Sequence, residues 1–168
     1  ERGQGRKSAI AVDKNGNDLA VNTKTPLFSF AEEQKHHQAG DGAVVFELDG
    51  LNCACYICYD LRFPELFRQT AADCHAIFVI ASWPRPRQKH WDALLLARAV
   101  ENQQYVVGVN RIGHGGGLDY SGGSAVYDPQ GNAVIAAGDR EGLFTADIEK
   151  ASVLHTRESM PFLDDRRF

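Results

Sequence analysis

Apolar segments of strand length alternate with helix-like segments through the middle of this chain. Leu51–Ile57 and Ala76–Ala81 are apolar on both faces, which is typical of strands buried between two layers. Proline at the start of residues 64–72 predicts a helix there, because proline is favoured in a first helical turn. Gln88–Asn102 is the clearest predicted helix, and Tyr105–Asn110 is predicted to be a further strand.

Both ends of the chain are richer in predicted strands than the middle. Ser8–Val12 and Asp18–Thr23 flank an Asn-Gly turn, which supplies the positive φ angles of a β-hairpin. We also expect a strand at 142–147 and a flexible glycine loop at 113–117. Helix–strand alternation between strand-rich ends predicts a single mixed α/β domain over residues 1–168, built in layers.

Composition narrows the class of protein. The net charge is -4 and acidic and basic residues are intermixed, which argues against a nucleic-acid or membrane partner, since either favours a basic patch. No apolar run approaches the roughly 20 residues that span a bilayer.

The polar start at Glu1 lacks the apolar core of a signal peptide, and we expect a fragment or a processed piece. Cys53 and Cys55 lie on one face of a predicted strand, too close and too local for a disulfide framework, and free thiols suit a reducing cytosol, so we expect a cytoplasmic protein.

Cys58 is the strongest candidate for chemistry. It follows Leu51–Ile57 and precedes a polar turn and a predicted helix, and a strand-to-helix turn exposes a nucleophile and aims backbone N–H groups at one point. The N–H of Tyr59 could help to hold a developing oxyanion. The alternative is that Cys58 is one more core residue, because free cysteine is among the most buried residue types. Cys53 and Cys55 fit that alternative better.

Glu101 is the second unusual residue. It shares a helical stripe with Leu94, which predicts that its carboxylate points inward, where it needs a cation or several donors. Arg98, three residues earlier, is one candidate partner and Lys24 is the other. From local sequence alone, Lys24 is better interpreted as a solvated surface lysine.

A zinc site is an alternative to a catalytic cysteine. Its ligands would be Cys53, Cys55, Cys58, Cys74 and His75. Structural zinc takes paired ligands two to four residues apart at each of two knuckles. Here one pair is adjacent and two of the cysteines lie inside a predicted strand, so the spacing favours the catalytic interpretation.

The segment Ile-Cys-Tyr-Asp-Leu-Arg-Phe-Pro-Glu at 57–65 resembles the nucleophile segment of the nitrilase superfamily, the carbon–nitrogen hydrolases. The likeness continues along nearly the whole chain. It includes the lysine segment at 24–28, the glutamate-bearing helix at 90–102, and the segments at 110–113 and 120–124. Within the superfamily, the loop at 82–87 and the segment at 31–33 are most similar to bacterial ω-amidases that act on 2-oxoacid amides.

This resemblance implies an α-β-β-α sandwich with a Glu-Lys-Cys site. Cys58 would be the nucleophile, and Lys24 would stabilise the tetrahedral intermediate together with the Tyr59 N–H. Glu101 would hold Lys24. The family's general-base glutamate lies upstream of the lysine segment, but the surroundings of Glu1 do not match its motif. We therefore expect the base to be missing, the sandwich to be truncated at its N-terminal side, and this chain alone to have little amidase activity.

The resemblance also implies a substrate. We expect hydrolysis of a small ω-amide through a cysteine thioester with release of ammonia, without a metal or organic cofactor, in a protein that forms a homodimer at full length. We place Trp83, Arg87 and Glu33 on the substrate-binding side. Arg85 or Arg87 could bind a carboxylate of the substrate, and the alternative is that both are solvated arginines on a proline-rich loop. The alternatives are a non-catalytic binding or assembly module with this fold, or another amidase of the nitrilase branch.

Overall fold

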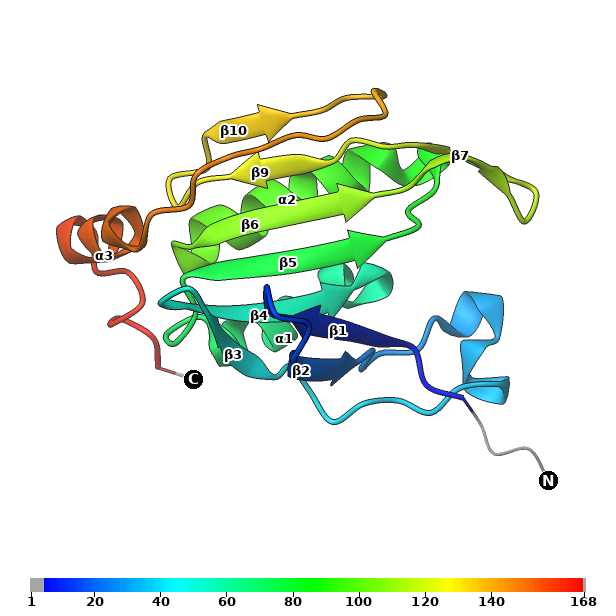
Figure 1. Ribbon diagram of the computed structural model, residues 1–168, viewed down its shortest axis with the longest axis horizontal. Coiled ribbons are helices and arrows are strands. Elements are labelled where there is room, and N and C mark those ends of the chain that lie inside the picture. Colours follow the sequence, from blue (N-terminus) through cyan, green and yellow to red (C-terminus); the bar gives the residue numbers. More distant parts are fainter. Residues whose placement is uncertain (1–4, 168) are drawn as a thin grey trace.

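The computed structural model describes residues 5–167 of the chain. In that part, the largest sheet has six strands in the order β10-β9-β6-β5-β4-β3 (Figure 1). The three central strands are parallel and the outer ones join them antiparallel. The strands are β3 (Val45–Leu48), β4 (Leu51–Ile57), β5 (Ala76–Ala81), β6 (Tyr105–Asn110), β9 (Ala125–Tyr127) and β10 (Ala133–Ala136). The predicted α/β class is therefore confirmed.

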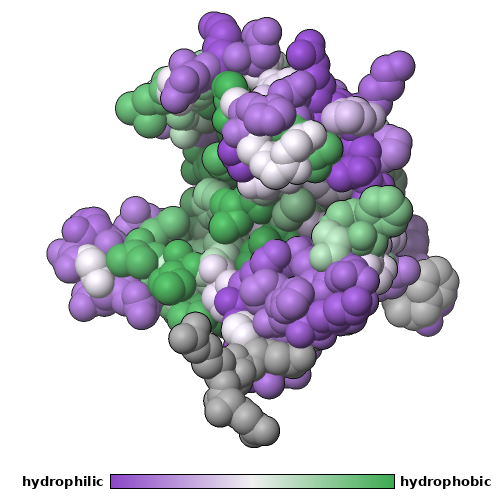
Figure 2. Space-filling view, turned by 90° about the vertical axis from the view of Figure 1, so that its right-hand side faces the viewer, coloured by the Kyte–Doolittle hydropathy of each residue, from purple (hydrophilic) through white to green (hydrophobic). Residues whose placement is uncertain are grey.

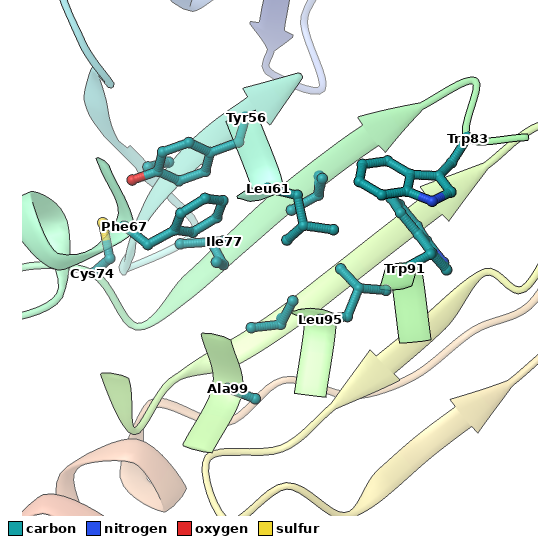
Figure 3. Close-up of a cluster of buried hydrophobic side chains, with 12 residues drawn as sticks. Tyr56, Leu61, Phe67, Cys74, Ile77, Trp83, Trp91, Leu95 and Ala99 are labelled. Atoms are coloured by element: carbon teal, nitrogen blue, oxygen red, sulfur yellow. The ribbon is translucent and has the colours of Figure 1, made fainter. Parts of the chain in front are cut away.

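Two helices connect the parallel strands and cover one face of this sheet. α1 (Pro64–Thr70) begins with proline at its first turn, and α2 (Gln88–Asn102) ends at Gln103 in a left-handed conformation. Aromatic and aliphatic side chains fill the space between α2 and the sheet (Figure 3). The large, fully buried members of this core include Tyr56, Leu61, Phe67, Ile77, Trp91 and Leu95.

The opposite face of the sheet is covered only in part. The hairpin of β1 (Ser8–Val12) and β2 (Asp18–Thr23) packs over β4 and β3 (Figure 1). α3 (Lys150–Ser159) packs at the other end of the same face. Beyond the hairpin, Ile80 and Val109 remain 42% and 50% exposed. This side of the sheet is therefore less completely buried than the helical side.

The carboxyl ends of β4, β5 and β6 meet at one edge of the sheet, where Ala81 pairs with Asn110. Short 3-10 helices follow two of these strands: η3 (Cys58–Arg62) after β4 and η4 (Arg85–Arg87) in the loop after β5. Loops at the carboxyl ends of parallel strands are where such sheets usually bind ligands. Figure 2 views the molecule from this end and shows hydrophobic residues gathered in a hollow between more hydrophilic lobes.

Two predictions for the C-terminal third of the chain are wrong. The glycines at 113–117 do not form an open loop, because they lie in the hairpin of β7 (Ile112–Gly115) and β8 (Leu118–Ser121). Residues 142–147 pair with no neighbouring strand, and Leu143 is 92% exposed. Apolar residues alone were a poor guide there, since a strand also needs a partner edge.

α3 was not predicted from the sequence. Its buried residues are Val153 and Thr156, so only a narrow stripe of the helix is buried. None of the helices between residues 5 and 167 is both long enough and apolar enough to cross a membrane.

Candidate active site

Cys58 lies on a sharp turn where β4 passes into η3. Its φ angle is 48°, in the left-handed region that side chains other than glycine seldom adopt. Asp60 stabilises this turn, because its Oδ2 accepts a hydrogen bond of 2.8 Å from the N–H of Ile57. Holding a non-glycine residue in such a conformation costs on the order of 1–3 kcal/mol, and this kind of strain is common at functional sites. The backbone here resembles the strand-to-helix elbow that presents a nucleophile.

Two lysines lie at the open end of the β1–β2 hairpin, next to this turn. Lys7 precedes β1 and Lys24 follows β2, and the N–H of Lys24 donates to the carbonyl of Lys7 at 2.8 Å. The two ammonium groups bind opposite oxygens of Glu33, with both Nζ–Oε distances at 2.6 Å. The N–H of Phe28 donates to the same carboxylate at 2.8 Å. Lys24 is only 3% exposed, so its interpretation as a solvated surface lysine is wrong.

The protonation of these groups follows from their surroundings. Burial alone would raise the pKa of Glu33, but hydrogen bonds from Lys24, Lys7 and the Phe28 N–H outweigh it and lower that pKa to about 2. Burial raises the pKa of the Cys58 thiol, and the nearby charge of Lys24 only partly offsets it. Glu33 is therefore a fixed anion, whereas Cys58 is a thiol that needs a proton acceptor before it can act.

Asp60 is a buried carboxyl group of a different kind. Burial raises its pKa to about 6, against the opposing hydrogen bond from the Ile57 N–H and the charge of Lys24. Its Oδ1 is buried without a hydrogen-bond partner in the described part of the chain. Asp60 thus supports the elbow under Cys58 at an electrostatic cost.

A cavity of about 550 Å³ opens over Cys58. A side chain from each neighbouring loop lines it, including Lys24, Phe28, Tyr59, Trp83 and Arg87. The volume is within the range of small-molecule sites, and the lining mixes aromatic surface with charge.

Trp83 is held in this cavity by the end of β6. Its N–H donates to Oδ1 of Asn110 at 2.7 Å, and its carbonyl accepts from Nδ2 of the same residue at 3.1 Å. Its indole N–H donates to the carbonyl of Arg87 at 2.8 Å. These hydrogen bonds fix the loop after β5 to the neighbouring strand and to η4, and the loop forms one wall of the cavity.

The structure brings most of the predicted site residues together. The residues that line the one cavity are Cys58, Tyr59, Lys24, Glu33, Trp83 and Arg87. Arg85, the alternative to Arg87, lines a neighbouring cavity instead. Glu1 lies outside the described residues.

Glu101 is the exception, and the prediction that it holds Lys24 is wrong. Its carboxylate binds Arg98 Nη1 at 2.8 Å and approaches Arg68 Nη2 at 3.6 Å. Glu101 stands near the C-terminal end of α2, whereas the cavity lies at the carboxyl edge of the strands. The buried stripe of α2 runs through Trp91, Leu95 and Ala99, one position away from the stripe that the sequence suggested.

The cysteine-rich zinc site has no geometric support. Cys53 packs into the core on the hairpin side of the sheet, and Cys74 packs into the core on the helix side. All four cysteines are free. Between residues 5 and 167, no group of three or more His, Cys, Asp and Glu side chains is arranged to hold a metal ion.

Several site residues were missed or misplaced by sequence reasoning. The sequence places Glu33 against the substrate, whereas in the structure its carboxylate binds Lys24 and Lys7. Arg62 also lines the cavity, and its signal was its place four residues after Cys58 in the nucleophile segment. No local signal marks Lys7, because its contact with Glu33 spans 26 residues.

Comparisons with known proteins agree with this geometry. The family model described as carbon-nitrogen hydrolase matches residues 3–158. The chain is 38% identical over 157 residues to a 2-oxoglutaramate amidase of Bacillus subtilis, covering 93% of this chain and 61% of that protein. It is 40% identical over 144 residues to the omega-amidase YafV of Escherichia coli K12, covering 84% of this chain and 56% of that protein. The chain thus spans about three fifths of the length of these relatives.

A solved structure is similar over almost the whole chain. It is a mutant of the amidase from Nesterenkonia sp. AN1, which shows covalent addition of the acetamide moiety of fluoroacetamide at its active-site cysteine. The TM-score is 0.81 at 30% identity, and the match covers 95% of this chain and 58% of that one.

Proposed function

We propose that this chain, which belongs to the carbon–nitrogen hydrolase family, carries the nucleophile of an amidase, with Cys58 as the attacking residue. The observation that carries the proposal is the arrangement at one cavity: a strained cysteine at a strand end beside a buried lysine that Glu33 holds in place. A structural cysteine would have no need of either the strain or the lysine.

The reaction proceeds in two halves. The Cys58 thiol loses its proton to a base, and the thiolate sulfur bonds to the amide carbonyl carbon while the C=O electron pair moves to oxygen. Lys24 and the Tyr59 N–H stabilise that oxyanion. When the oxyanion collapses, the C–N bond breaks and the nitrogen leaves as ammonia with the proton from the base. Water then adds to the thioester, releasing the carboxylic acid and restoring the thiol.

This scheme requires a group that accepts the proton of the Cys58 thiol. Glu33 is the only carboxylate among the described residues that line the cavity, and it is a poor base because three donors hold its pKa at about 2. Asp60 is engaged with the Ile57 N–H and does not line the cavity. We therefore assign Glu33 to positioning Lys24, and we look outside the described residues for the acceptor.

The proposed substrates are short ω-amides of dicarboxylic acids, such as 2-oxoglutaramate. Two relatives with 38% and 40% identity are named as a 2-oxoglutaramate amidase and an omega-amidase. The cavity of about 550 Å³ and its cationic lining suit a small anionic amide better than a bulky N-acyl amide.

The test combines covalent trapping with turnover. Fluoroacetamide should modify Cys58, seen by mass spectrometry of the peptide, and Cys58→Ala should remove that modification. Cys55→Ala is the matched control, since Cys55 lies three residues earlier and does not line the cavity. In a protein that carries the proton acceptor, ammonia release should be faster from 2-oxoglutaramate than from a nitrile or a large N-acyl amide. Modification at Cys55 or Cys74 in place of Cys58, or preference for the nitrile, contradicts the proposal.

A non-catalytic binding module is the second candidate. The observation that favours it is that burial raises the pKa of the Cys58 thiol while no described cavity carboxylate is free to deprotonate it. Iodoacetamide labelling distinguishes the two functions. If Cys58 reacts no faster than an ordinary exposed thiol, and no amide is turned over even in a protein that carries the proton acceptor, the binding module is the better description.

A further inference from the structure

One wall of the cavity over Cys58 comes from the β7–β8 hairpin, which has no part in the reaction proposed above. Leu118 and Tyr120 of β8 line the cavity. Leu118 is 40% exposed, so it lies at the rim, and Tyr120 is half-buried. At the base of the hairpin, Oγ of Ser121 donates to Oε1 of Gln88 at 3.1 Å. The hairpin is thereby fixed to the first residue of α2, with one of its sides toward any ligand in the cavity.

The side of the hairpin that carries Tyr120 receives side chains from β8 only. The residue paired with Leu118 is Gly115, and the residue paired with Tyr120 is also a glycine. Arg111 occupies the space that these glycines leave, because a Cβ at Gly115 would lie 2.5 Å from its Nη2. The Arg111 guanidinium lies 4.4 Å from the ring centroid of Tyr120, and its Nη2 donates to the carbonyl of His114 at 2.9 Å. Arg111 thus holds the Tyr120 ring in place.

The hydroxyl group of Tyr120 is available to a ligand. In the part of the chain that the structure describes, its Oη makes no hydrogen bond. Arg111 has no carboxylate within ion-pairing distance among the same residues, so its charge is not neutralised there. A cation over the ring of a phenol draws electron density from it and makes the O–H a better donor. Tyr120 therefore offers the cavity an uncharged hydrogen-bond donor.

Tyr120 also differs in position from the other hydroxyl groups of the cavity. The described lining has two more, those of Tyr59 and Ser82. Both adjoin the nucleophile, since Tyr59 follows Cys58 in the chain and the Sγ of Cys58 is 4.0 Å from the carbonyl oxygen of Ser82. These two groups belong to the end of the cavity where the amide would react. Tyr120 comes from a separate hairpin, and a 2-oxo-ω-amide carries its ketone at the end remote from the amide.

We propose that Tyr120 is a specificity-determining residue whose hydroxyl donates a hydrogen bond to the ketone oxygen of a 2-oxo-ω-amide. A methylene group in that place would leave the phenol unpaired, and a protonated amine has no lone pair to accept the hydrogen bond. Tyr120 would thus favour 2-oxoacid amides over both the plain and the amino acid amides. This inference rests on the proposed amidase function and adds the group that recognises the ketone.

A binding experiment tests the inference without turnover. The Cys58→Ala chain is used so that the thiol cannot add to a ketone, and calorimetry compares 2-oxoglutarate with glutarate. The Kd for 2-oxoglutarate should be about 2–10-fold lower, the range of one net hydrogen bond. Adding Tyr120→Phe should make the two Kd values equal and leave that of glutarate unchanged, while the ring under Arg111 is kept. Tyr127→Phe is the matched control, because Tyr127 lines the neighbouring cavity.

Equal affinity for the two acids before Tyr120→Phe is added, a preference that survives it, or absence of binding would each overturn the inference. A kinetic comparison adds a second readout in a protein that carries the proton acceptor. There, Tyr120→Phe should raise KM for 2-oxoglutaramate with little change in kcat, and should leave KM for glutaramate the same. Equal losses for both amides would indicate a structural role and contradict the inference. If the binding preference depends on Tyr120 but that protein hydrolyses no amide, the role of Tyr120 is supported and the proposed function is contradicted instead.

Discussion

Glu33 and Glu101 each lie between two basic side chains, yet they do different things. Glu33 binds Lys7 and Lys24, which flank the two strands at the open end of the hairpin, and it keeps a buried ammonium beside Cys58. Glu101 binds Arg98 of its own helix and approaches Arg68 of the neighbouring one. The ion pairs of Glu33 lie in the wall of the cavity over Cys58, whereas those of Glu101 connect two helices. A carboxylate with cationic neighbours is thus no sign of catalysis until its position in the fold is known.

The sharpest way to test this difference is to remove each charge in turn. In a protein that carries the proton acceptor, Glu33→Gln should lower kcat for a 2-oxo-ω-amide by about 100-fold, because Lys24 would lose its fixed position as an oxyanion donor. Glu101→Gln should leave kcat within about twofold, since Glu101 does not line the cavity. Steady-state ammonia assays measure both, and circular dichroism checks folding. Glu33→Asp provides an intermediate case, with the charge kept and the reach shortened. Similar losses in Glu33→Gln and Glu101→Gln would break the comparison.

The acid stability of the fold should depend on Glu33. Its pKa is about 2 in the folded chain and near 4.5 in the unfolded one, so its contribution is present above about pH 4.5 and lost as the pH falls toward 2. The contribution amounts to at most about 3 kcal/mol of unfolding free energy. Urea unfolding across this pH range should show a smaller loss for Glu33→Gln than for the unmodified chain. Parallel curves for the two proteins would show that the ion pairs contribute little.

Asp60 should have the smallest effect on the unfolding free energy, and its contribution should change with pH in the opposite direction to that of Glu33. Burial raises its pKa to about 6, so its favourable contribution is present below about pH 3.8 and lost as the pH rises through 6. Asp60→Asn should therefore make the unfolding free energy vary less with pH between pH 4 and 7. At neutral pH the variant should gain less than about 3 kcal/mol of unfolding free energy. Urea unfolding at several pH values measures it. A variant less stable at pH 7 than the unmodified chain would show that the charged form supports the elbow.

Much of the sheet was predictable because its signals are local. Continuous apolar runs between turn residues are typical of strands in a sheet buried on both faces. Three such runs are strands with the predicted bounds: Leu51–Ile57, Ala76–Ala81 and Tyr105–Asn110. α2 also has the predicted bounds, Gln88–Asn102. The segment 142–147 shows the limit, because apolar residues become a strand only where a neighbouring edge is available.

The site was predictable in part for the same reason. Cys58 and Tyr59 could be placed from the strand that precedes them, and the wall of the cavity from the loop around Trp83. The partner of Lys24 could not be predicted, because Glu33 lies in a stretch of 3-10 turns that has no hydrophobic periodicity. Glu101 looked suitable from helical spacing, but spacing gives a face of a helix and not which end of the sheet that residue reaches.

The ion pairs of Glu33 also have a dynamic consequence. They connect the open end of the β1–β2 hairpin to the wall of the cavity, so any local unfolding of that hairpin withdraws Lys24 from Cys58. Small surface hairpins belong to the parts of a protein that open most easily, well before the whole chain unfolds. We therefore expect the lifetime of the Lys24–Cys58 arrangement to follow the opening rate of the hairpin more closely than the stability of the core between α2 and the sheet.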